Sequence, residues 1–245
     1  LRESGRKLIM VTGRELDELL GIFPEIGLFD WVVAENGALL YQPSTKLEKP
    51  LAERPPDKFV AELRARGVGP ISVGRVIVAT WEPHETKCLE VIRDMALELE
   101  IIFNKGAVMI LPTGVNKATG LVAALEHLGL SPHNVVGTGD AENDHAFLKI
   151  CECSAAMANA LQALKDRADL VTRADHGAGV TEVDAVLCDL RENDPVWFRP
   201  MLMHAVTTGR ITETLSLRAR DVMASGVVYV RQGDGIKTGA KEVGV

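Results

Sequence analysis

Several features that would assign this sequence to other classes of protein are missing from it. No apolar run approaches the roughly 18–20 residues that a membrane-spanning helix needs, so we expect no membrane partner. The 245 residues carry 27 lysines and arginines against 34 acidic residues, a net charge of −7. A protein that binds nucleic acid through its phosphates needs a basic surplus. The charge therefore argues against a nucleic-acid partner, although a short basic segment is still allowed.

Cysteine is scarce, and a signal peptide is absent. Four cysteines in a chain of this length do not make a disulfide scaffold. Cys151 and Cys153 have no neighbours that complete a metal-ligand set, so we interpret them as reduced cysteines of the core or of a loop. The composition, 47% hydrophobic and 25% charged, is typical of a globular protein. With no secretory signal, we expect a cytoplasmic protein.

The sequence also lacks an initiator methionine. Residues 1–5 read Leu-Arg-Glu-Ser-Gly, which is typical of the last turn of a helix followed by its glycine cap. We therefore expect that a segment upstream of Leu1 is missing and that the chain is a fragment.

Short apolar runs alternate with helical patterns, which predicts an α/β fold built on a doubly wound parallel, Rossmann-like sheet. Residues 7–11, 31–34 and 135–137 are suited to buried strands. Residues 116–128 predict a helix with one apolar face. Four prolines among mixed charges in residues 41–56 indicate a linker. The predicted domains are a core at residues 1–42 and 113–190, an inserted α+β unit at 43–112, and a tail of uncertain origin at 191–245.

Three polar clusters lie where ligands bind in an open α/β sheet, beyond the carboxyl ends of strands. Thr12, Gly13 and Arg14 follow the first strand, where a hydroxyl and backbone N–H groups at a helix N-terminus can cradle a phosphate. Residues 139–144, Gly-Asp-Ala-Glu-Asn-Asp, offer oxygen ligands that suit Mg²⁺. Lys117 opens a helix, where its ammonium can pair with a phosphate or a nucleophilic carboxylate.

Each cluster has a structural alternative when it is taken alone. Thr12 can be a helix N-cap, Lys117 can be a solvated lysine, and residues 139–144 can be a simple turn. The order of the clusters along the chain favours one shared site over three unrelated local structures.

In this order the clusters resemble the motifs of the haloacid dehalogenase superfamily of phosphatases, in its Cof-type or sucrose-phosphatase-like branch. Residues 11–14 match the second motif, whose hydroxyl binds the transferring phosphoryl group. Residues 116–118 match the third motif, whose lysine stabilises the phosphoryl group and the nucleophile. Residues 139–144 match the fourth motif, and residues 35–38 (Glu-Asn-Gly-Ala) are typical of the branch just before its α/β cap. The resemblance covers about residues 1–190.

The resemblance implies a Mg²⁺-dependent phosphatase that acts on a small phosphorylated metabolite, with a sugar phosphate as the expected substrate. The catalytic residues that it implies are Thr12, Lys117, Asp140, Asn143 and Asp144. The phosphate-binding residues are Thr12, Gly13, Arg14 and Lys117, and the metal ligands are Asp140 and Asp144.

The first motif of the family is absent. That motif, Asp-x-Asp-Gly-Thr, lies on the strand before residues 7–11 and supplies both the nucleophile and the general acid/base. No Asp-x-Asp occurs anywhere in the chain. The intact enzyme is expected to form and hydrolyse an aspartyl-phosphate, and this chain is expected to be inactive alone. A non-catalytic phosphate-binding domain is an alternative function.

The insert corresponds to the cap that closes over the site and contacts the leaving group of the substrate. Candidate residues on that surface are Arg75, Trp81, His84, Lys105 and Met109. Packing is the alternative for Trp81 and Met109, and a loop position is the alternative for His84.

The tail resembles a second family, the tyrosine recombinases. In residues 208–222, Arg210 would match the catalytic arginine, although one residue before it is missing, and residues 228–237 would match the following hairpin. The later His-x-x-Arg and tyrosine motifs are absent, and a plain amphipathic helix explains the pattern as well. A chimera with a DNA-integration segment is therefore an alternative that the acidic charge disfavours.

Overall fold

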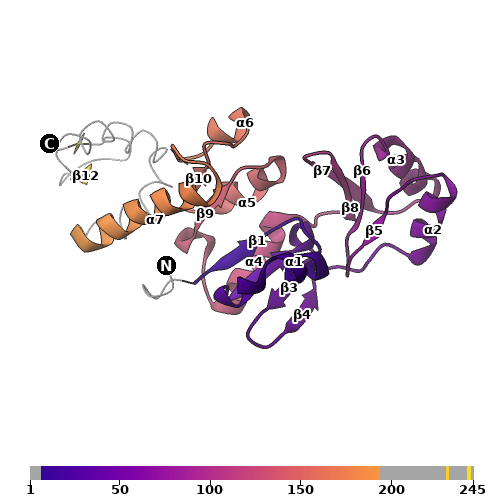
Figure 1. Ribbon diagram of the computed structural model, residues 1–245, viewed down its shortest axis with the longest axis horizontal. Coiled ribbons are helices and arrows are strands. Elements are labelled where there is room, and N and C mark those ends of the chain that lie inside the picture. The colour runs from indigo at the N-terminus through magenta and orange to yellow at the C-terminus, as the bar shows by residue number, and fades with distance from the viewer. Residues whose placement is uncertain (1–6, 194–229, 232–241, 244–245) are drawn as a thin grey trace. The chain divides into compact units, whose positions relative to one another are not determined.

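The computed structural model describes residues 7–193, 230–231 and 242–243 (Figure 1). By its internal contacts the chain divides into two units. The first is Leu1–Leu130 with Ala141–Phe147, and the second is Ser131–Asp140 with Leu148–Val245.

The first unit begins with a four-stranded sheet in the order β1-β2-β3-β4. β1 (Ile9–Val11) pairs in parallel with β2 (Trp31–Ala34), and between them run α1 (Leu16–Ile22) and the 3-10 turn η2 (Pro24–Leu28). Every residue of β2 is buried. Burial on both faces explains why this strand is a continuous apolar run in the sequence, and its predicted bounds are confirmed.

A β-hairpin completes this sheet where the sequence indicated a linker. β3 (Leu39–Gln42) pairs with β2, and β4 (Leu47–Pro50) pairs with β3, both antiparallel. The linker prediction is wrong because Pro43 lies in the turn and Pro50 ends an exposed edge strand. Proline and charged side chains are tolerated at such an edge.

The insert has a sheet of its own, which is four-stranded, antiparallel and ordered β5-β6-β8-β7. Figure 1 shows the helices α2 (Asp57–Ala65) and α3 (Glu85–Asp94) on the same side of it. Phe59 and Leu63 of α2 and Cys88 of α3 are buried with the strands in one apolar cluster. The strands are β5 (Ser72–Val73), β6 (Val78–Trp81), β7 (Leu99–Asn104) and β8 (Ala107–Pro112).

Helix α4 (Lys117–Leu128) packs against the first sheet after the insert. Ala124 of α4 lies in a cluster with Trp31, Val33 and Leu40 of that sheet. The sequence predicted this helix and its buried face.

The second unit contains a parallel three-stranded sheet in the order β11-β10-β9. Helix α7 (His176–Asn193) packs on it through Val183, which is buried with Ala155 and Met157. A two-stranded antiparallel pair, β12 (Val230–Arg231) with β13 (Glu242–Val243), lies further along the chain. The remaining elements are η3 (Glu35–Gly37), η4 (Pro132–Asn134), β9 (Val136–Gly139), η5 (Glu142–Asp144), α5 (His145–Ile150), β10 (Cys153–Ala156), α6 (Gln162–Lys165) and β11 (Leu170–Val171).

Parallel strands that alternate with helices confirm the predicted α/β class. The division into core, cap and tail stays a prediction. Residues 208–222, and most of 228–237, lie outside the described part of the chain, so the recombinase resemblance is untested. None of the helices that the structure describes is long and apolar enough to cross a membrane.

Three cysteines in the described ranges are buried as free thiols, which confirms the interpretation of Cys151 and Cys153. Burial penalises the thiolate, so it raises the pKa of Cys88 to about 11 and those of Cys151 and Cys153 to about 12.

Candidate functional site

The loops that follow β1 and β2 lie against one another through backbone hydrogen bonds. The N–H of Thr12 donates to the carbonyl of Val33 over 2.8 Å, and the N–H of Asn36 donates to the carbonyl of Thr12 over 3.0 Å. The N–H of Glu35 donates to the carbonyl of Arg14 over 2.9 Å. The ends of two adjacent parallel strands therefore place the Thr-Gly-Arg loop beside residues 35 and 36.

Thr12 does not cap the helix that follows it. Helix α1 begins only at Leu16, with Glu15 at the N-cap position. The Thr12 hydroxyl instead accepts a hydrogen bond from the N–H of Arg14 over 3.2 Å. The exposed Arg14 side chain pairs with Glu18 one helical turn further on. The structure therefore places Arg14 in a local turn and gives its guanidinium a carboxylate partner.

Gly13 is surrounded by side chains from three other parts of the first unit. A Cβ at this position would lie 3.4 Å from Sδ of Met109, 3.5 Å from Nδ2 of Asn143 and 3.9 Å from Oδ1 of Asn36. The second and fourth predicted motifs therefore meet here. Met109, one of the five candidates on the insert, meets them as well.

Lys117 is the centre of a buried polar network. It is only 5% exposed, and its Nζ donates to Oδ1 of Asp144 over 2.5 Å and to Oδ1 of Asn143 over 2.9 Å. Nδ2 of Asn143 donates to Oδ1 of Asn36 over 2.8 Å, and Oδ2 of Asp144 accepts from the N–H of Ala141 over 2.9 Å. The solvated alternative for Lys117 is wrong, because the side chain is buried. Its expected pairing with a phosphate or a nucleophilic carboxylate stays a prediction.

Small residues allow the start of α4 to approach the turn at residues 35–37. The side chain of Asn116 caps α4, which makes Lys117 its first helical residue. Gly37 has φ of +105°, and a Cβ there would lie 1.9 Å from the carbonyl oxygen of Asn116. A Cβ at Gly120 would lie 2.7 Å from Cα of Gly37. Only glycine allows these backbones to come so close. This close packing positions Lys117 beside its hydrogen-bond partners.

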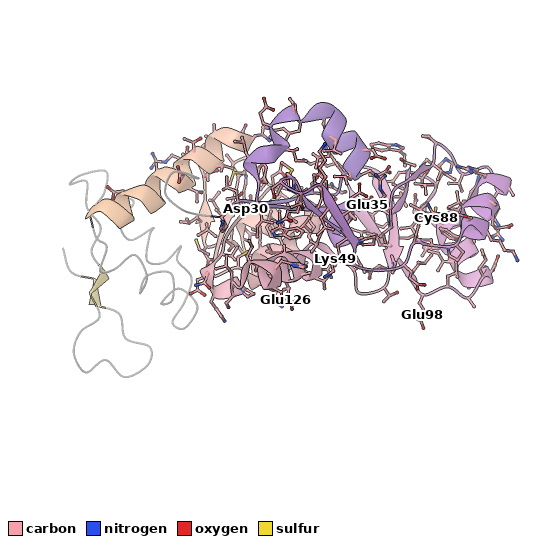
Figure 2. The ribbon with its side chains drawn as sticks, turned by 90° about the horizontal axis from the view of Figure 1, so that it is seen from below. Asp30, Glu35, Lys49, Cys88, Glu98 and Glu126 are labelled. Atoms are coloured by element: carbon pink, nitrogen blue, oxygen red, sulfur yellow. The ribbon has the colours of Figure 1, made fainter. Side chains whose placement is uncertain are left out.

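Glu35 is a residue whose role sequence reasoning missed. It is fully buried, and Figure 2 shows it where the first sheet meets the insert. Its carboxylate accepts hydrogen bonds from three consecutive backbone N–H groups, those of Arg75 (2.8 Å), Val76 (2.7 Å) and Ile77 (2.9 Å). The signal in the sequence was a carboxylate directly after a buried strand.

Arg75 is held by acidic side chains rather than by the predicted site. Its guanidinium donates to Asp17 over 2.6 and 2.9 Å and to Glu48 over 2.8 and 3.3 Å. The hydrogen bond from Arg75 lowers the pKa of Asp17, and the two carboxylates raise the pKa of Arg75. The structure thus pairs this candidate with α1 and β4.

The other candidates on the insert differ in their surroundings. His84 Nε2 lies 3.0 Å from the carbonyl oxygen of Gly69, which supports the loop alternative. Trp81 is half exposed, and Lys105 lies in the turn between β7 and β8. Met109 is buried and is the one of the five whose side chain lies beside Gly13. β7 also contacts the turn at residues 142–144.

Asp140 belongs to the second unit. Its Oδ2 accepts from Nδ2 of Asn159 over 2.6 Å and lies 3.9 Å from Nδ1 of His176. Within the described ranges, no group of three or more His, Cys, Asp or Glu side chains is placed to hold a metal ion. Mg²⁺ can bind through a single carboxylate with several waters, and the side chain of Asp140 is a quarter exposed. Asp144 is nearly buried and is bonded through both oxygens.

The known proteins that this chain resembles in sequence are hydrolases, and phosphatases among them. A family model described as haloacid dehalogenase-like hydrolase matches residues 70–183. The chain is 33% identical over 188 residues to phosphoglycolate phosphatase 2 of Saccharolobus solfataricus, with 72% of this chain and 75% of that protein covered. It is 31% identical over 189 residues to phosphoglycolate phosphatase of Methanothermobacter thermautotrophicus, with 74% and 82% covered.

Comparison with solved structures shows the fold. A haloacid dehalogenase-like hydrolase from Bacteroides thetaiotaomicron matches with a TM-score of 0.62 and 16% identity, covering 74% of this chain and 86% of that chain. The sucrose-phosphatase of Synechocystis sp. PCC6803, solved with sucrose and phosphate, matches with a TM-score of 0.56 and 18% identity, covering 75% and 85%.

Proposed function

Since the chain belongs to the haloacid dehalogenase-like hydrolases, and to the phosphatases among them, we propose that it binds the phosphoryl group of a small phosphorylated metabolite for Mg²⁺-dependent hydrolysis. The observation that carries this proposal is the buried ammonium of Lys117 held by Asn143 and Asp144. The proposed site adds Thr12 and Gly13, whose loop lies against Asn36 and Asn143.

Lys117 supplies the positive charge of the proposed site. An ammonium almost excluded from water interacts with a phosphoryl dianion more strongly than a solvated one, because the local dielectric constant is low. Asn143 and Asp144 hold Nζ in one place, so little reorganisation is needed when the substrate binds. The Thr12 hydroxyl, which accepts locally from Arg14, has its proton available for a phosphoryl oxygen.

A metal ion is part of the proposal, with Asp140 as its protein ligand. A Mg²⁺ ion held by Asp140, with water completing its shell, would supply the positive charge that phosphoryl chemistry needs. Asp144 acts instead as a positioning residue, because Lys117 and the N–H of Ala141 bind its two oxygens. Of the two aspartates expected to bind metal, we therefore assign the metal to Asp140.

The proposed substrate is a small phosphorylated metabolite. Relatives with 31% and 33% identity are named phosphoglycolate phosphatases, which makes phosphoglycolate the first substrate to test. A sugar phosphate, the class that the sequence motifs implied, is the second. Met109 lies beside Gly13, which supports the proposal that this residue of the insert contacts the leaving group.

The chain as it stands contains no Asp-x-Asp, and we propose that it binds phosphate without turning substrate over. The test measures two quantities. Isothermal titration with inorganic phosphate and Mg²⁺ measures binding by the chain and by the variants Lys117→Met and Lys58→Met. Phosphate release from phosphoglycolate, glucose 6-phosphate and p-nitrophenyl phosphate measures turnover, with and without EDTA.

We expect phosphate to bind the wild-type chain and the exposed-lysine control Lys58→Met, and Lys117→Met to lose at least about tenfold in affinity. We expect turnover only from a version extended at its N-terminus by a strand that carries Asp-x-Asp. Equal affinity in Lys117→Met would overturn the proposed site. Rapid hydrolysis by the unextended chain would refute the proposal that this chain lacks a nucleophile. An extended chain that binds phosphate without turnover would favour a non-catalytic phosphate-binding domain.

A further inference from the structure

The turn at residues 35–38 contacts both the insert and the Lys117 network. On the insert side, the fully buried Glu35 accepts from the N–H groups of Arg75, Val76 and Ile77. A buried carboxylate is tolerated only when such donors replace water. Because the donors are backbone groups, this contact fixes the path of the chain where it enters β6, rather than the rotamer of one side chain.

Close packing reinforces the same contact. A Cβ at Gly74 would lie 2.6 Å from Oε1 of Glu35, so the insert backbone lies directly against the carboxylate. Ala38, at the other end of the turn, is buried in one cluster with Val76, Ile77 and Met109. The turn therefore holds the insert by hydrogen bonds at Glu35 and by apolar contact at Ala38.

On the site side, the next residue of the turn, Asn36, holds the network. Oδ1 of Asn36 accepts from Nδ2 of Asn143, whose Oδ1 in turn accepts from Lys117. Glu35 and Asn36 have φ of 51° and 55°, and Gly37 has φ of 105°. Positive φ is uncommon for a residue other than glycine, and less so for asparagine than for glutamate. Glu35 and Asn36 are adjacent in this turn, so we expect a shift of Glu35 to displace Asn36.

We propose that Glu35 is a positioning residue. It couples the position of the insert backbone at residues 75–77 to the positions of the Lys117 and Asn143 side chains. It does not touch Lys117. It holds residues 75–77 directly and holds Asn36 through the shared turn. The proposal rests on the proposed function only in identifying the Lys117 network as the phosphate site.

The test is hydrogen–deuterium exchange, followed by mass spectrometry, on the 245-residue chain and its Glu35→Gln variant. Glutamine keeps the size of the side chain but replaces one acceptor oxygen with a donor that faces N–H groups. We expect the amides of residues 75–77 to exchange about tenfold faster or more. We also expect at least about threefold faster exchange at Ala141 and Asp144, whose amides close the network.

Two further variants separate coupling from general loss of stability. Arg75→Ala removes the guanidinium bonds to Asp17 and Glu48 but keeps the backbone N–H that Glu35 binds, so residues 141–144 should exchange as in the wild type. Gly74→Ala displaces the Glu35 carboxylate without altering its chemistry. It should therefore cause the same changes in amide exchange as Glu35→Gln. Peptides from α2 (Asp57–Ala65), which lies in the same unit, should stay unchanged in all variants, since a general loss of stability of that unit would affect them too.

Affinity for inorganic phosphate supplies a functional measurement. Glu35→Gln and Gly74→Ala should weaken it about threefold or more, and Arg75→Ala should not. The coupling is overturned if both variants loosen residues 75–77 while residues 141–144 and phosphate affinity match the wild type. If Glu35→Gln does not fold, Gly74→Ala decides. A wild-type chain that fails to bind phosphate contradicts the proposed function, whereas exchange at residues 141–144 still tests the coupling.

Discussion

The ion pair between Lys117 and Asp144 should make a large contribution to the stability of the first unit. The two side chains are 6% and 7% exposed, and their charged atoms lie 2.5 Å apart. Replacing Lys117 by methionine keeps most of the volume but leaves a buried carboxylate without its countercharge. Removing one partner of a buried pair costs about 3–5 kcal/mol. The N–H of Ala141 still donates to Asp144 in the variant, so we expect a loss near the lower figure, about 3 kcal/mol.

The assay is urea denaturation followed by far-UV circular dichroism on Lys117→Met, Asp144→Asn and the double variant. Each single variant leaves one buried charge, whereas the double variant leaves none. We therefore expect the double variant to be more stable than the sum of the single losses implies, by about 2 kcal/mol or more. Lys58→Met changes an exposed lysine of α2 and should stay within about 0.5 kcal/mol of the wild type.

Two results would refute this reasoning. One is a loss below about 1 kcal/mol in Lys117→Met, which is the range of an exposed pair. The other is strict additivity in the double variant. Either result would mean that the ammonium is solvated, and the electrostatic argument for a phosphate site at Lys117 would lose its basis.

Two further predictions concern packing and pH. Gly120→Ala in α4 should destabilise the chain by about 1–3 kcal/mol in urea denaturation, because its Cβ would lie 2.5 Å from Cγ1 of Val33. At Gly21 in α1 an added Cβ would have nothing within 4 Å, so Gly21→Ala should raise the free energy of unfolding by up to about 1 kcal/mol. Equal effects of the two substitutions would contradict the close packing at Gly120. Since burial raises the pKa of Cys88 from 9.0 to about 11, and those of Cys151 and Cys153 to about 12, the stabilisation they contribute is complete below pH 9. It should be lost as the pH rises from 9 toward 12. Iodoacetamide at pH 8 should alkylate these thiols far more slowly in the native chain than in urea, because their thiolate fraction is lower by about 100-fold for Cys88 and about 1,000-fold for Cys151 and Cys153. Peptide mapping measures the alkylation rate of each cysteine in the native chain and in urea. Similar rates in the two states would show that the thiols are accessible and have ordinary pKa values.

Local patterns in the sequence were enough for many of the elements. The strand at Trp31–Ala34 was predicted with its bounds because a strand buried on both faces is a continuous apolar run. The order of the motifs also favoured one shared site at the carboxyl ends of the strands, and Gly13 of the second motif does lie beside Asn143 of the fourth.

The hairpin at residues 39–50 was missed for a definite reason. Its second strand is an exposed edge that contains a proline and charged residues, so its composition is that of a linker. Only the pairing with a neighbouring strand makes it part of the sheet.

The sequence by itself determined the residue types of the site, their order and the fold class. The tertiary structure alone decided which of those residues meet. Arg75 was a candidate for the surface of the insert that contacts the leaving group, but it pairs with Asp17 and Glu48, which are 58 and 27 residues away. No partner was predicted for Glu35. In the folded chain its carboxylate accepts hydrogen bonds from three backbone N–H groups 40 to 42 residues further along. Such contacts depend on the path of the whole chain, and periodicity and local motifs carry no information about that path.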